Sequence, residues 1–149
     1  MNAAQAIQEQ RLRLASFNSM DGDAVADELN KRPDLWDSYV FGNFAGLSHY
    51  SGRLIELRDL KDGIINADTL LILTDKKHWP ELKKILQKKR LHVDELGVTF
   101  ADDFSDGKYE REGDGIVPFL SGDEAAVALG GGFYRQNGKI PAIVRVWWD

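Results

Sequence analysis

The sequence predicts a single globular domain over residues 1–149, of the α/β or α+β class. We expect a mixed sheet with one β-α-β unit, a helical N-terminus and a C-terminal antiparallel hairpin. Three observations support this: helical patterns dominate the first 40 residues, a strand-helix-strand pattern follows in the middle, and an Asn-Gly pair separates two strand-like segments near the end. A length of 149 residues suits one domain.

The composition is that of an ordinary globular protein. Hydrophobic residues make up 43% of the chain and charged residues 29%, and no apolar run approaches the roughly 18 residues that span a bilayer, so we expect no membrane partner. The N-terminal segment lacks the apolar core of a secretory signal and the chain has no cysteine, which favours a cytoplasmic location. The net charge of −5 argues against a nucleic-acid binder.

Two helices are predicted in the N-terminal part. Residues 3–16 have helical spacing, but the polar Gln10 falls into the same stripe as Ile7, so we expect this helix to dock loosely. Asp21 is suited to cap a second, short helix that runs through Leu29. The N-terminus is therefore expected to be mainly helical.

The middle of the chain predicts strands around a helix. Residues 53–59 alternate apolar and polar side chains, as in a half-buried strand. In the segment 67–75, residues 70–73 are apolar without alternation, as in a strand covered on both faces, and we expect this strand to be central. A helix is expected from Trp79 to about Arg90, and a strand over 95–103. Strand, helix and strand within about 30 residues predict a right-handed β-α-β unit with two parallel strands.

The last segment predicts a hairpin and assigns different roles to two adjacent tryptophans. Residues 133–136 and 140–148 flank the Asn-Gly pair, a strong turn sequence. Along a strand, Trp148 shares its face with apolar residues only, so we expect it in the core. Trp147 shares its face with Arg145, so we expect that face to be partly exposed. Trp147 and Arg145 are candidate contacts for a partner protein or a second copy of the chain.

A second candidate binding region is rich in aromatic residues. A helical turn is expected after Pro33, and residues 40–52 fit neither helical nor strand spacing, which predicts a structured loop. Several glycines there would let the loop approach a ligand closely, and aromatic side chains bind with little loss of entropy. We expect some of these aromatic side chains to be buried in the core instead. The candidate partner-binding residues in this region are Trp36, Tyr39, Phe41, Phe44 and Tyr50.

Acidic residues offer an alternative, catalytic interpretation. Asp75 follows one of the two proposed parallel strands, and Asp102 and Asp103 follow the other. Ligands of open α/β sheets bind at this carboxyl edge, where carboxylates could hold Mg²⁺ for phosphoryl chemistry. Acids after strands are also ordinary turn formers, and no glycine-rich phosphate loop is present. We therefore keep a metal site as the alternative and expect no cofactor.

A basic segment offers a third interpretation. Residues 76–92 carry seven Lys or Arg against one Glu. Only Lys84 and Lys88 project opposite the apolar stripe of the predicted helix, so the charge is dispersed rather than gathered into a phosphate-binding face. Basic residues also stabilise a helix C-terminus. Nucleic-acid binding is therefore disfavoured.

Taken together, these features favour a protein that acts by binding another protein, as an inhibitor, an immunity-type protein or an accessory module. No nucleophile–base pair is recognisable, and His78 and His92, near opposite ends of one helix, cannot share a metal. We therefore lean against an enzyme. The alternatives are a Mg²⁺-dependent phosphoryl-transfer or hydrolytic enzyme and a nucleic-acid binder.

Overall fold

The computed structural model describes residues 1–16, 19–42, 67–100 and 139–148. This part of the chain forms helices and strands in an α+β arrangement, which confirms the predicted fold class. No helix in it is long and apolar enough to cross a membrane. The elements, in chain order, are α1 (Ala3–Arg13), α2 (Gly22–Lys31), η2 (Pro33–Leu35), β1 (Ser38–Gly42), β2 (Thr69–Asp75), α4 (Trp79–Leu86), η4 (Lys89–Leu91), β3 (Glu95–Phe100) and β4 (Pro141–Trp147).

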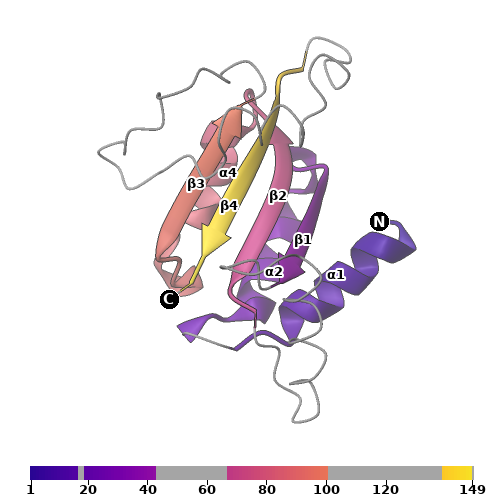
Figure 1. Cartoon of the computed structure of the whole chain (residues 1–149), viewed down its shortest axis with the longest axis vertical. Helices are drawn as coiled ribbons and strands as arrows, with labels where there is room; N and C mark the ends of the chain where they lie inside the picture. Colours follow the sequence, from indigo (N-terminus) through magenta and orange to yellow (C-terminus); the bar gives the residue numbers. More distant parts are fainter. Residues whose placement is uncertain (17–18, 43–66, 101–138, 149) are drawn as a thin grey trace.

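The four strands form one sheet in the order β1-β2-β4-β3 (Figure 1). All three described strand pairings are antiparallel, so this part of the sheet is not mixed. The strands β2 and β3 run in the same direction because each is antiparallel to β4, which lies between them. The predicted β-α-β connection through α4 therefore exists, but its two parallel strands are not neighbours. The sequence did not show that the C-terminal strand would separate them.

The predicted C-terminal strand is present as β4. Both of its hydrogen-bonding edges are occupied, one by β2 and the other by β3. The predicted first arm of a hairpin, residues 133–136, lies outside the described residues, as does the predicted strand at 53–59. The structure also adds a strand that the sequence did not predict, because β1 occupies residues expected to form a helical turn and a loop.

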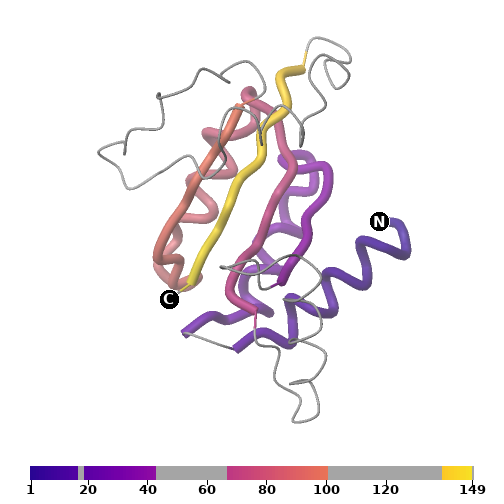
Figure 2. The backbone as a smooth tube through the Cα atoms, viewed as in Figure 1, coloured from indigo at the N-terminus to yellow at the C-terminus, as the bar shows by residue number. Residues whose placement is uncertain are grey.

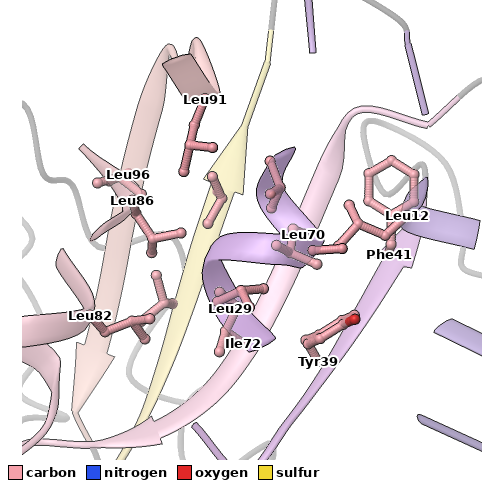
Figure 3. Packing of buried hydrophobic residues seen from close by; sticks show 14 of the residues in the cluster. Leu12, Leu29, Tyr39, Phe41, Leu70, Ile72, Leu82, Leu86, Leu91 and Leu96 are labelled. Atoms are coloured by element: carbon pink, nitrogen blue, oxygen red, sulfur yellow. The ribbon is translucent and has the colours of Figure 1, made fainter. Parts of the chain in front are cut away.

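The core lies between one face of the sheet and the helices (Figure 3). Alternation along the strands sends Leu70 and Ile72 of β2 to this face, where Leu29 of α2 and Leu82 and Leu86 of α4 also lie. These side chains are almost completely buried. Their burial fixes the position of β2, and with it the strand β1 that pairs with its outer edge.

Local sequence explains where the helices begin. The carboxylate of Asp21 accepts a hydrogen bond of 3.0 Å from the backbone N–H of Ala24, so the predicted N-cap of α2 is confirmed. The helix α4 begins at Trp79 with Pro80 in its first turn, where a missing N–H costs nothing. The helix α1 buries only Leu12, in agreement with the loose docking expected from its pattern.

Candidate partner-binding groove

The helix α1 lies along the outer edge of β1, at the end of the sheet (Figure 2). The side-chain amide of Gln5 accepts a hydrogen bond from the backbone N–H of Tyr39 at 3.0 Å and donates one to its carbonyl at 3.3 Å. Gln8 accepts from the N–H of Phe41 at 3.0 Å, and Arg11 donates to the carbonyl of Phe41 at 3.1 Å. Side chains of α1 thus satisfy the backbone groups of an edge strand.

A groove with a volume of about 470 Å³ lies where α1, the end of α2 and β1 meet. Amide side chains of Gln5, Gln8 and Asn30 contribute to its walls, together with the apolar Trp36 and Val40. Among the described residues that line it there is no lysine or arginine. The groove therefore combines amide side chains and the acidic Asp37 with an aromatic wall. A few polar groups beside apolar ones are the usual composition of a ligand or peptide site.

Trp36 is held in a fixed orientation at this groove. Its indole N–H donates a hydrogen bond of 3.0 Å to the carbonyl of Leu29, at the end of α2. Its ring packs on Tyr39, with ring centroids 5.1 Å apart and an angle of 54° between the planes. The side chain is half-buried. A partner that contacts it would not need to immobilise it first.

The other aromatic candidates have different positions. Tyr39 and Phe41 are each only 2% exposed, so their side chains belong to the core and not to an accessible surface. Strand alternation explains this, since both point to the helix-covered face of the sheet. Phe44 and Tyr50 lie outside the described residues. Among the described residues, none forms a hydrogen bond with the hydroxyl of Tyr39. Burial together with the nearby Glu9 carboxylate raises the pKa of Tyr39 to about 12.

Trp147 and Arg145 lie on the opposite face of the sheet, and both are half-buried. The indole N–H of Trp147 donates to the carboxylate of Asp68 at 3.3 Å. The guanidinium carbon of Arg145 lies 5.8 Å from the centre of the Trp147 ring, and the same guanidinium pairs with Glu95 at 3.1 Å. The two candidate residues therefore contact each other, but neither lines the groove. They share the open face of the sheet with the groove residue Val40, because Val40 pairs with Leu71 and Leu71 with Arg145.

The structure gives Asp75 a specific partner at the end of β2. One oxygen of this buried carboxylate accepts from the backbone N–H of His78 at 2.9 Å, and the other lies 2.7 Å from the imidazole Nδ1 of His78. Burial alone would raise the pKa of Asp75, but these hydrogen bonds and the Lys139 charge hold it below its ordinary value. Asp75 is thus an ionised, hydrogen-bonded turn residue.

The structure places the ends of β2 and β3 at the same edge of the sheet, as the metal hypothesis requires. Asp75 pairs with Pro141 and Phe100 with Ala142, but β4 lies between the two ends, so they are separated by about two strand spacings, roughly 10 Å. Asp102 and Asp103 lie outside the described residues. Within the described part of the chain, no three potential metal ligands come together.

Part of the basic segment is neutralised within the chain. The buried carboxylate of Glu28 in α2 pairs with Lys88 and Arg90 at 2.7 Å each and with Lys31 at 3.0 Å. Its hydrogen bond with Lys88, opposed by burial and supported by Lys31 and Arg90, lowers the pKa of Glu28 from 4.5 to about 2. Lys84, one of the two residues expected to face outward, pairs with Glu81 at 3.3 Å.

Comparison with protein families, characterised proteins and solved structures found no match. The candidate site therefore depends on the geometry of this chain alone. Sequence reasoning identified Trp36 but missed the amides of Gln5, Gln8 and Asn30. The three-residue spacing of Gln5, Gln8 and Arg11 on one helical stripe is a pattern that could have indicated a polar contact, although it does not name the strand edge that these residues meet.

Proposed function

We propose that this chain acts by binding another protein, as an inhibitor, an immunity-type protein or an accessory module. The observation that supports this proposal is the groove between α1 and β1, with the fixed indole of Trp36 in its wall. Tryptophan residues held in place by the rest of the fold are common energetic centres of protein interfaces. The partner would place an apolar side chain against the indole and peptide groups near the amides.

The chemistry of the groove favours a protein over a nucleic acid. A nucleic-acid site needs lysine or arginine side chains that neutralise phosphates. The described groove residues include neither, whereas Lys88 and Arg90 of the basic segment already pair with Glu28. Amide side chains, by contrast, donate and accept hydrogen bonds as a peptide backbone does.

The test is capture of a stoichiometric protein from the native cell, quantified by mass spectrometry, with three variants beside the wild type. Val40→Arg places a long charged side chain in the groove at a position that is 37% exposed, and Trp36→Ala removes the indole. Both should reduce capture by about tenfold or more, the loss expected for an interface centre worth over 1.4 kcal/mol. Lys84→Ala, an exposed change away from the groove, is the matched control.

Capture that is equal for the wild type and for both groove variants would show that the groove is not the binding surface. If Trp147→Ala alone abolished capture, the binding surface would be the part of the sheet around Trp147 and Arg145 and not the groove. Co-purification of nucleic acid at physiological salt, in place of a protein, would remove the proposal altogether. Thermal melts of each variant separate lost binding from lost folding.

A second candidate function is a Mg²⁺-dependent phosphoryl-transfer or hydrolytic enzyme. One observation favours it: Asp75 is a buried, ionised carboxylate at the sheet edge where β3 also ends. Calorimetry with Mg²⁺ or Mn²⁺ should then show saturable heat that Asp75→Asn and Asp102→Asn both weaken. Absence of heat, with no change in melting temperature at millimolar metal, would remove this candidate.

A further inference from the structure

The two ends of α1 are attached to the rest of the chain in different ways. From Met1 to Arg11 no residue is buried, and Ile7 is 57% exposed. Hydrophobic anchoring begins at Leu12, which is fully buried. Next to it, Gly22 fits so tightly that an added Cβ would lie 1.8 Å from the carbonyl oxygen of Leu12. The C-terminal end of α1 is thus fixed on α2, whereas its N-terminal turns contact β1 through polar side chains.

These polar side chains protect an edge that has no protection of its own. Edge strands usually avoid pairing with other chains by carrying charged residues or proline. The sequence of β1, Ser38–Gly42, contains neither. The groups that an incoming strand would use are the N–H and C=O of Tyr39 and Phe41, and the contacts of Gln5, Gln8 and Arg11 occupy all four of them.

The outer edge of β1 is self-complementary. Tyr39 and Phe41 are two residues apart, with Val40 between them. In an antiparallel pair about a twofold axis at Val40, Tyr39 lies opposite the partner's Phe41, and the two residues exchange both hydrogen bonds. The same holds for Phe41 and the partner's Tyr39. The two Val40 side chains, apolar and 37% exposed in the single chain, then meet as a cross-strand pair.

We propose that the outer edge of β1 is an interface for a second copy of this chain, and that the N-terminal turns of α1 cover it in the single chain. The inference rests on the proposed function, which assigns a protein partner to the groove between α1 and β1. Here that partner is a second copy of this chain, bound at the β1 side of the groove. Movement of the helix about its anchored end at Leu12 exchanges the side-chain contacts of Gln5, Gln8 and Arg11 for the peptide groups of the partner strand.

The absence of cysteine from the chain allows a clean cross-linking test. Val40→Cys places a thiol at the proposed axis, where opposed residues have Cα atoms about 4.5 Å apart, within the range that a disulfide spans. Ser38→Cys is the matched control: it is exposed on the same strand and face, but two copies would be separated by roughly 13 Å. Under mild oxidation, we expect Val40→Cys to form the linked dimer about tenfold faster or more.

A second experiment opens the edge directly. The double variant Gln5→Ala with Gln8→Ala removes the covering amides and keeps good helix formers. By sedimentation, the apparent dissociation constant of the dimer should fall by about tenfold, since a larger fraction of the chain exposes the edge. The matched control is Gln10→Ala, which changes an exposed residue of the same helix.

Equal cross-linking of Val40→Cys and Ser38→Cys would overturn the inference. So would a double variant that stays folded by circular dichroism and sediments like the wild type. If the double variant did not fold, cross-linking of the two cysteine variants, which leave α1 intact, would still test the proposed interface. The proposed function fails separately: it is lost if Trp36→Ala and Val40→Arg leave partner capture unchanged, whatever the cysteines show.

Discussion

The indole N–H of Trp148 donates a hydrogen bond of 2.8 Å to the carbonyl oxygen of Leu91 in η4. Trp148 is fully buried, and the bond satisfies a polar atom that would otherwise be costly inside the core. The adjacent Trp147 is half-buried on the other face, where its N–H reaches Asp68. Two neighbouring tryptophans thus have different roles because successive side chains of a strand point to opposite faces.

Trp148→Ala should lower the free energy of unfolding by about 3 to 5 kcal/mol, as the loss of a large buried side chain normally does. Trp148→Phe keeps most of the apolar volume but leaves the carbonyl of Leu91 without its donor. It should cost less, about 1 to 3 kcal/mol. Urea denaturation monitored by far-UV circular dichroism measures both. Equal stability of Trp148→Ala and the wild type would contradict the assigned role.

Trp147→Ala should lower the free energy of unfolding by only about 1 kcal/mol, because the side chain is half-exposed and its contacts with Asp68 and Arg145 are individually weak. The same denaturation assay, run beside Trp148→Ala, gives the comparison. A loss of several kcal/mol would make Trp147 a core residue. A small loss of stability combined with lost capture of a partner would make it an anchor.

Glu28→Gln should destabilise the protein at pH 7 by about 1 to 2 kcal/mol. The lowering of the Glu28 pKa from 4.5 to about 2 corresponds to about 3 kcal/mol at full value, but Lys88 and Arg90 are half-exposed, so solvent screens part of it. Glu81→Gln, which breaks an exposed pair with Lys84, is the matched control and should change little.

The pH dependence of this effect has a defined sign. Because the pKa of Glu28 is lower in the folded chain, its contribution is complete above about pH 4.5 and is lost as the pH falls toward 2. The stability difference between the wild type and Glu28→Gln should therefore shrink over this window. Urea midpoints measured at several pH values give the curve. A difference that stays constant down to pH 2 would show that the carboxylate charge is not responsible.

Tyr39→Phe should leave stability unchanged or raise it by up to about 1 kcal/mol, since the buried hydroxyl has no hydrogen-bond partner in the described part of the chain. The pKa of Tyr39 is raised from 10.0 to about 12, so its contribution is complete below pH 10 and is lost as the pH rises toward 12. The wild type should lose more stability than Tyr39→Phe in that interval. A clear destabilisation of Tyr39→Phe at pH 7 would reveal a partner for the hydroxyl.

The sequence alone determined features that depend on the local pattern of side chains. The alternation in the last strand placed Trp148 in the core, the apolar run of 70–73 indicated a central strand, and Asp21 marked the start of α2. Each is decided within one segment, because the period of a helix or strand and the bond of a cap involve residues only a few positions apart.

Only the tertiary structure decided which segments meet. The insertion of β4 between β2 and β3, the contact of Gln5 with the edge of β1, and the ion pair of Glu28 with Lys88 join residues far apart in the chain. Backbone N–H and C=O groups are the same in every residue except proline, so the order of the strands cannot be read from any single segment. The position of a strand is set instead by the burial of apolar faces throughout the fold, and the polar contacts at its edges follow from that position.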